Sequence, residues 1–122
     1  MTLDNASGIR VMRESDVPYS GLDDAPAMEL ARVVTDAATT DLGGGFIRYQ
    51  EGDGELADWT LKYDEALYVI DGVLEVISNS ESFVASAGEV MVIAKGATVT
   101  YRGEKGTKVF FVLQPRDWAT RS

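Results

Sequence analysis

From residue 44 onward, apolar and polar positions alternate in short runs that are separated by turn residues. Extended runs are predicted over residues 45–50, 58–63, 65–70, 73–78, 82–86, 89–94, 97–102 and 107–113. The turns between them recur about every 8–12 residues, which is typical of an antiparallel sandwich or barrel. No segment in this part of the chain keeps a helical period long enough to compete with that interpretation. The pattern therefore predicts an all-β fold.

The dipeptide Asp71-Gly72 stands between two of these apolar runs. Asp-Gly favours a type I′ turn, because both central residues of that turn need positive φ. The sequence therefore predicts a two-residue β-hairpin that joins the runs on either side. A polar turn is also predicted over residues 79–81.

The first 43 residues have a less regular pattern. Early chain breakers interrupt it, namely Pro18, Gly21 and Pro26. Two interpretations stay open for the next segment: a helical turn that begins in residues 26–34, or an edge strand over residues 30–35. We expect residues 1–43 to form an extended segment that wraps the barrel or lies in a dimer interface. Residues 44–118 then form the barrel core.

The composition indicates one globular domain and removes several kinds of chemistry. The chain has 122 residues, of which 45% are hydrophobic, and these values suit a single domain with a real core. It contains no cysteine and no histidine. Disulfides, zinc–thiolate sites and thiol nucleophiles are therefore excluded, as are Ser-His-Asp and Cys-His catalytic arrangements.

The charge and the apolar runs bear on partners and location. A formal net charge of −9 makes nucleic acid a poor partner, because its phosphates would be repelled. The longest apolar runs, residues 66–70, 90–94 and 109–113, are far shorter than a membrane-spanning helix. The N-terminal residues have neither the basic nor the apolar region of a secretory signal. We expect a cytoplasmic protein with no membrane partner.

Two stretches resemble the two short motifs of the cupin family. The first resembles a glutamate followed by a strand and a glycine, here Glu65 and Gly72. The second resembles a strand between two glycines, here Gly88 and Gly96. The resemblance covers about residues 44–114. It implies a single-domain cupin barrel, which is a double-stranded β-helix or jelly roll, and it implies a homodimer.

Cupins usually hold a metal ion with three histidines and one glutamate. In this sequence Trp59, Leu61 and Val99 occupy the histidine positions of that frame, and only Glu65 remains. Indole and aliphatic side chains cannot ligate a transition metal. We therefore expect no metal and no other cofactor. A site made of carboxylates alone, for magnesium or calcium, would need Glu65 together with Asp58 or Asp64.

A closer resemblance is carried by three segments. WTLKYDE at residues 59–65, VIAKG at residues 92–96 and QPRDW at residues 114–118 resemble the ethanolamine-utilisation Q (EutQ) proteins, which are cupins without the metal-binding histidines. This resemblance implies a place in bacterial microcompartment operons, and an acetate kinase activity has been attributed to the family. The sequence contains no Walker-type loop or arginine cluster for ATP.

Glu65 is the predicted centre of a small-molecule site. If it points into the barrel, strand alternation points Trp59, Leu61, Tyr63, Leu67 and Val69 inward too, and Val99 and Tyr101 on a second strand. A carboxyl group in such apolar surroundings has a raised pKa, which suits a general acid or base. The predicted catalytic residues are Glu65, Tyr63 and Tyr101. In the alternative interpretation Glu65 pairs with Lys62 or Lys95, or caps backbone amides.

The remaining candidates are predicted to bind the substrate. They are Trp59, Leu61, Lys95, Val99, Leu67 and Tyr49. Trp59 either forms a wall of the pocket or fills the space that a metal would take. Trp118 is predicted to pack on the outside of the barrel or on a dimer partner.

Three functions follow from this set. The first is a metal-independent enzyme of the isomerase, dehydratase or cyclase type that carries out acid/base chemistry on a small organic molecule. The second is a non-catalytic, EutQ-like accessory protein that uses the same pocket to bind a metabolite. The third is a structural barrel whose pocket is plugged by Trp59 and Leu61.

Overall fold

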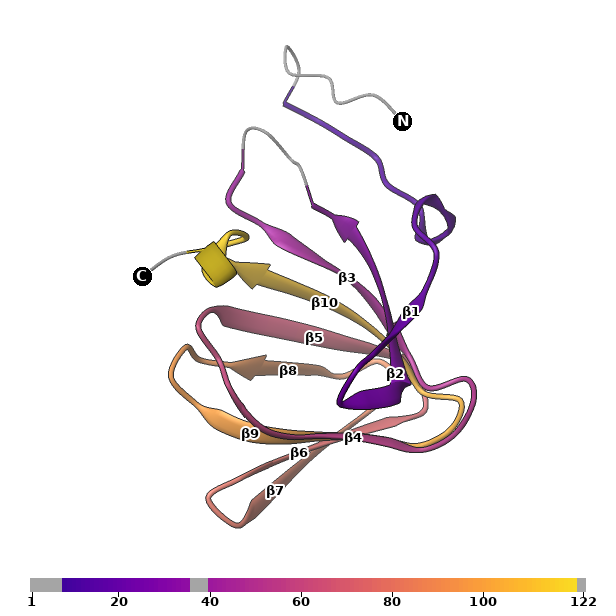
Figure 1. The fold of residues 1–122 in the computed structure, drawn as a ribbon, viewed down its shortest axis with the longest axis vertical. Coiled ribbons are helices and arrows are strands. Elements are labelled where there is room, and N and C mark those ends of the chain that lie inside the picture. Colours follow the sequence, from indigo (N-terminus) through magenta and orange to yellow (C-terminus); the bar gives the residue numbers. More distant parts are fainter. Residues whose placement is uncertain (1–7, 36–39, 121–122) are drawn as a thin grey trace.

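The computed structural model describes residues 8–35 and 40–120, which fold into two antiparallel β-sheets (Figure 1). The elements in chain order are the 3₁₀ helix η1 (Glu14–Asp16), β1 (Ser20–Leu22), β2 (Ala25–Val34), β3 (Gly43–Arg48), β4 (Gly54–Thr60), β5 (Asp64–Asp71), β6 (Val73–Ser78), β7 (Glu81–Ser86), β8 (Val90–Ile93), β9 (Thr98–Gly103), β10 (Lys108–Gln114) and the 3₁₀ helix η2 (Trp118–Thr120). The predicted all-β class is confirmed. No helix of the described residues is long and apolar enough to cross a membrane.

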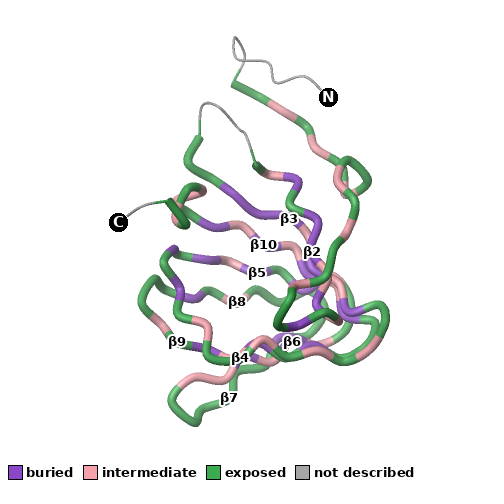
Figure 2. The backbone as a smooth tube through the Cα atoms, in the orientation of Figure 1, coloured by how far each residue is buried: buried purple, intermediate pink, exposed green. Residues whose placement is uncertain are grey.

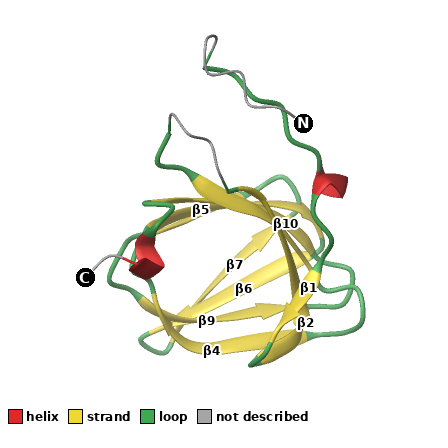
Figure 3. Ribbon diagram, turned by 45° about the horizontal axis from the view of Figure 1, so that its top comes forward, coloured by secondary structure: helices red, strands yellow, loops and turns green. Residues whose placement is uncertain are grey.

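The two sheets face each other across one core. The larger sheet has the strand order β1-β2-β3-β10-β5-β8, and the smaller has the order β4-β9-β6-β7. Figure 3 shows the strands of the two sheets facing each other, with η2 at one end of the strands. Burial alternates along the strands (Figure 2), so Val109, Phe111 and Leu113 of β10 face the core while Phe110 and Val112 face outward.

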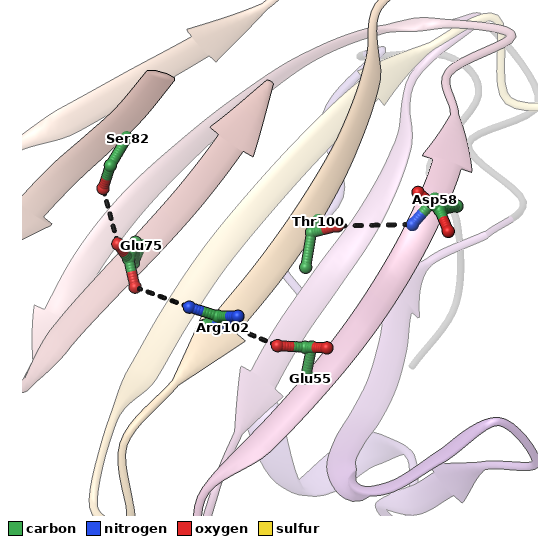
Figure 4. Close-up of polar contacts among 6 residues, drawn as sticks. All are labelled: Glu55, Asp58, Glu75, Ser82, Thr100 and Arg102. Atoms are coloured by element: carbon green, nitrogen blue, oxygen red, sulfur yellow. Dashed lines mark hydrogen bonds and ion pairs between the residues drawn. The ribbon is translucent and has the colours of Figure 1, made fainter. Parts of the chain in front are cut away.

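The outer face of the smaller sheet carries a polar cluster around Arg102. The guanidinium of Arg102 on β9 lies between the carboxylates of Glu55 and Glu75, which come from the strands on either side (Figure 4). Thr100, two residues earlier on β9, accepts a hydrogen bond from the backbone N–H of Asp58. Because side chains alternate along a strand, Tyr101 points to the opposite face, into the core.

The prediction of a two-residue hairpin at Asp71-Gly72 is wrong. The strands before and after it, β5 and β6, lie in different sheets, so the chain turns a corner there. Of the two residues only Gly72 has a positive φ, of 81°. The two-residue hairpin of the type I′ kind lies instead between β6 and β7, where Asn79 and Ser80 have φ values of 52° and 65°. The predicted turn over residues 79–81 falls there.

The N-terminal segment supplies two strands to the larger sheet. The strand β2 pairs with β1 on one side and with β3 on the other. The helical-turn interpretation is therefore wrong, because residues 25–34 form a strand. The edge-strand interpretation is confirmed for the end of β2, since beyond Leu30 the strand pairs with β3 alone. The close approach of β1 to β2 is possible because Gly21 carries no Cβ, which would otherwise collide with the carbonyl oxygen of Pro26.

Candidate functional site

A cavity of about 320 Å³ lies between the two sheets, a size that suits a small molecule. Its lining comes from both sheets, the β1–β2 turn and η2. The lining residues are Leu22, Asp23, Asp24, Met28, Leu30, Arg32, Ile47, Leu56, Trp59, Tyr63, Glu65, Tyr101, Phe111, Leu113 and Trp118. The wall is mostly apolar and aromatic, which is the usual composition of a ligand site.

Glu65 is the buried charged group of this cavity. It lies on β5, and only 6% of its surface is exposed. Its cross-strand neighbours are Ile93 on β8 and Leu113 on β10, which offer no hydrogen bond from their side chains. Burial in these surroundings raises the pKa of Glu65 to about 7, although the hydrogen bond from Tyr101 acts in the opposite direction.

Tyr101 reaches Glu65 from the opposite sheet. Its hydroxyl donates a hydrogen bond of 2.7 Å to Oε1 of Glu65. Burial raises the pKa of Tyr101 far above its ordinary value, and the neighbouring carboxylate adds to that effect. Tyr101 therefore keeps its proton at neutral pH and acts as a hydrogen-bond donor.

Tyr63 and Trp59 form a second polar contact in the same cavity. The indole Nε1–H of Trp59 donates a hydrogen bond of 2.8 Å to Oη of Tyr63. Burial and the charge of Glu65 raise the pKa of Tyr63 to about 12. The strand β4 has a register shift between Leu56 and Trp59, where Asp58 has a φ of 53°. This bulge lets both Leu56 and Trp59 line the cavity.

Trp118 lies in the cavity wall, so the prediction that it packs on the outside of the barrel is wrong; the alternative prediction, a contact with a dimer partner, stays a prediction. Its ring centroid lies 5.8 Å from that of Trp59, with an angle of 88° between the planes, and 5.0 Å from that of Tyr63. The chain just before it is fixed by Arg116, whose backbone N–H donates to the carbonyl of Asp41. The segment that follows β10 therefore turns back over the end of the barrel.

The cavity also contains charged residues that sequence reasoning missed. Arg32 reaches it from β2, and Asp23 and Asp24 reach it from the β1–β2 turn. No motif marked them, because the resemblance to cupins begins only at residue 44. The available signal was the spacing of Met28, Leu30 and Arg32, which alternation places on one face of a strand.

The structure brings together four of the predicted site residues and not the other five. Glu65, Tyr63, Tyr101 and Trp59 line the cavity. Leu61, Leu67 and Val99 are buried in the core beside it. Tyr49 is fully buried against Gly54 and Gly103 and does not line the cavity. Lys95 lies in an exposed turn, where its backbone N–H donates to Oδ1 of Asp64.

The residues at the cupin metal positions do not fit a metal ion. Trp59, Leu61 and Val99 offer no donor that a metal accepts, which leaves Glu65 as a single carboxylate. Within residues 8–35 and 40–120, no group of three histidine, cysteine, aspartate or glutamate side chains is placed to hold one. The arrangement instead offers a carboxyl group that titrates near neutrality, a fixed phenol donor and three aromatic rings.

Comparisons with known proteins identify the family of the chain. The family model of the ethanolamine utilisation protein EutQ matches residues 4–120. A protein of Salmonella typhimurium named acetate kinase EutQ is 30% identical over 113 residues, which are 91% of this chain and 48% of that protein. The chain spans about half the length of the curated relatives it matches.

Solved structures share the fold. The crystal structure of an ethanolamine utilization protein Q from Salmonella typhimurium LT2 superposes with a TM-score of 0.78 at 27% identity, and the match covers 94% of this chain and 92% of that one. An RmlC-like cupin from Shewanella frigidimarina superposes with a TM-score of 0.65 at 13% identity, covering 83% of this chain and 86% of that one. The predicted cupin barrel is confirmed.

Proposed function

The chain belongs to the ethanolamine utilisation protein EutQ family, and we propose that its barrel binds a small organic molecule and exchanges a proton with it through Glu65. The observation that carries the proposal is the position of Glu65. Its carboxyl group is buried at a ligand-sized cavity and receives a hydrogen bond from Tyr101. Within the described residues it forms no ion pair with Lys62, Lys95 or any other cation.

The proposed roles follow from the protonation states. A carboxyl group with a pKa of about 7 exists in both forms near neutral pH, so Glu65 accepts a proton from the substrate and returns it. Tyr101 stabilises the ionised form of Glu65 through its hydrogen bond. Tyr63 offers a hydroxyl to an oxygen that gains negative charge on the substrate. This chemistry is that of an isomerase, dehydratase or cyclase.

The test is proton exchange on a panel of small enolisable ketones and aldehydes in D₂O, followed by NMR. The wild-type chain should speed exchange at the carbon next to the carbonyl for at least one compound. Glu65→Gln keeps an acceptor for Tyr101 and should abolish that exchange while the compound still binds. Equal exchange by the two proteins would remove Glu65 from the chemistry. Binding without exchange in the wild-type chain would favour the non-catalytic, metabolite-binding alternative.

Acetate phosphorylation is the second candidate, because the curated relatives carry the name acetate kinase. In this chain Arg32, at the rim of the cavity, is the cation that would meet a carboxylate. The test is the formation of ADP from ATP with and without acetate. Acetate-dependent ADP formation that is lost in Arg32→Ala would favour this candidate over proton exchange.

We further propose that two copies of the chain associate through the outer face of the larger sheet. One cross-strand row there holds Phe46, Phe110, Tyr68 and Val90, and the next holds Val112, Ala66 and Val92. These rows carry no charge, whereas two chains of net charge −9 repel each other elsewhere. Light scattering should give a dimer for the wild-type chain and a monomer for Val92→Lys. Val84→Lys, on the other sheet, should leave the dimer intact. A monomeric wild-type chain would contradict the proposal.

A further inference from the structure

The wall and the floor of the cavity favour the same kind of ligand charge, a positive one. Three aromatic rings meet in its wall, with Trp59 and Trp118 nearly perpendicular and Tyr63 packed on Trp118. The face of an aromatic ring carries negative electrostatic potential and attracts a cation, most strongly for tryptophan. An anion in the same place would be repelled. A positively charged group placed over the face of one of these rings would be stabilised in this way.

The floor of the cavity adds a carboxylate. Oε1 of Glu65 accepts the hydrogen bond from Tyr101, and Oε2 has no hydrogen-bond partner within the described part of the chain. That second oxygen is available to a donor on the ligand. A hydrogen bond between an ammonium group and a buried carboxylate is among the stronger polar contacts in proteins.

The rim contains one cation and two anions. Asp23 and Asp24 line the cavity at the β1–β2 turn, and Arg32 lines it from β2. Arg32 is exposed, so a carboxylate ligand held there would lie in water, where an ion pair contributes about 0–1 kcal/mol. An anion that moved deeper would meet the carboxyl group of Glu65. The net charge of −9 also attracts cations and repels anions at long range.

We infer that the cavity selects a small organic ammonium ion, which donates to Glu65 and places its alkyl part against Trp59, Tyr63 and Trp118. This inference rests on the proposed function, because the same cavity and the same carboxyl group serve both. The ammonium group is then the hydrogen-bond donor that Glu65 faces.

Binding should depend on pH, because an ammonium ion pairs with the ionised form of Glu65. The titratable groups that face Glu65 are Tyr101 from β9 and Tyr63 from the loop before β5, with Arg32 from β2 further out. The strands β3, β8 and β10 present only apolar side chains to it. Both tyrosines stay neutral below pH 9, because burial raises their pKa values. Glu65 itself sets the pH dependence.

The test uses three probes of nearly equal size and different charge: propylammonium chloride, 1-propanol and sodium propionate. Each is titrated into the wild-type chain in a calorimeter at pH 6 and pH 8. Propylammonium should bind at least about tenfold more tightly than propionate at pH 8. Its affinity should fall about tenfold at pH 6, where most of a group with a pKa near 7 is protonated. The affinity of 1-propanol should change little with pH.

Two variants distinguish the effect of the Glu65 carboxylate from the effect of the net negative charge of the protein. Glu65→Gln should lose both the preference for propylammonium and its pH dependence. Glu55→Gln, on the outer face of β4 (Figure 4), removes the same charge outside the cavity and should keep both. The wild-type titrations test the inference even if Glu65→Gln does not fold.

Each contrary outcome is distinct. Tighter binding of propionate, equal affinity for all three probes, or binding of none would overturn the inference. Proton exchange on neutral carbonyl compounds that persists in such a case would leave the proposed function standing. Conversely, selective binding of propylammonium without any exchange would reject the proposed catalysis and keep the ligand class.

Discussion

The hydroxyl of Tyr101 and the carboxylate of Glu65 join the two sheets across the core through a hydrogen bond of 2.7 Å. Tyr101 lies on β9 of the smaller sheet and Glu65 on β5 of the larger one. This hydrogen bond lies in apolar surroundings, where the hydroxyl group and the carboxyl group meet each other's need for a hydrogen-bond partner. It fixes the carboxyl group that the proposed chemistry needs.

Tyr101→Phe should raise the pKa of Glu65 further above about 7. The hydrogen bond from Tyr101 favours the ionised carboxylate, and its loss leaves burial unopposed. The measurement is a titration of the ¹³C carboxyl resonance of Glu65. Tyr68→Phe, on the outer face of β5, is the matched control and should leave this pKa unchanged. A pKa that stays the same or falls in Tyr101→Phe would mean that the hydrogen bond does not act on the charge.

Glu65→Gln should change how stability depends on pH. The pKa of Glu65 is about 7 in the folded chain against an ordinary value of 4.5, so the folded chain binds more protons between these pH values than the unfolded chain. The stability of the wild-type chain therefore falls as the pH rises through this window. A difference of this size corresponds to about 3 kcal/mol.

The measurement for Glu65→Gln is urea unfolding at pH 4.5 and pH 8. The free energy of unfolding of the variant, relative to the wild-type chain, should increase by up to about 3 kcal/mol between the two. Glu55→Gln, at a glutamate about half exposed, should show no such change. A constant difference between Glu65→Gln and the wild-type chain would mean that Glu65 titrates normally.

Gly72→Ala should destabilise the corner between the sheets by at least about 2 kcal/mol. Gly72 has a φ of 81°, and a Cβ there would lie 2.4 Å from Oγ1 of Thr107. Thr107 cannot move freely, because its hydroxyl accepts from the N–H of Val73 and donates to its carbonyl. Gly88→Ala is the control for strain alone, because Gly88 has a φ of 90° and open space around it. Equal losses in chemical unfolding of the two variants would show that Thr107 gives way.

Tyr49→Phe should leave the free energy of unfolding unchanged or increase it by up to about 1 kcal/mol. The Tyr49 ring is fully buried, and its hydroxyl has no hydrogen-bond partner within residues 8–35 and 40–120. Removing an unsatisfied buried donor relieves its desolvation cost. Tyr101→Phe is the contrasting variant. It leaves the buried carboxyl group of Glu65 without its hydrogen-bond donor and should lower the free energy of unfolding by about 1–3 kcal/mol. A clear loss in Tyr49→Phe, measured by urea unfolding, would reveal a partner for that hydroxyl.

Strand positions were predictable because burial follows side-chain alternation. The inward positions from residue 59 to residue 69 were assigned correctly, and four site residues lie on that face or on its partner strand. The hairpin at Asp71-Gly72 failed for a physical reason. Turn chemistry describes a local backbone path, and it does not say whether the strands that leave the turn pair with each other.

The rest of the candidate site was not predictable from local pattern. Arg32, Asp23 and Trp118 come from segments near the two ends of the chain, and they reach the cavity through pairing with distant strands. The strand β2 is placed by β3, and the turn that carries Trp118 follows from the position of β10 between β3 and β5. Such long-range pairing has no signal in a window of a few residues.

The two tryptophans of the chain, Trp59 and Trp118, are in edge-to-face contact in the wall of one cavity. Indole emission responds to the polarity and contacts around the ring, and elsewhere the chain has no indole to mask that response. The protein thus carries its own optical reporter of cavity occupancy. A ligand that enters the barrel should change the emission wavelength or the intensity of the protein's tryptophan fluorescence, and no attached label is needed to detect it.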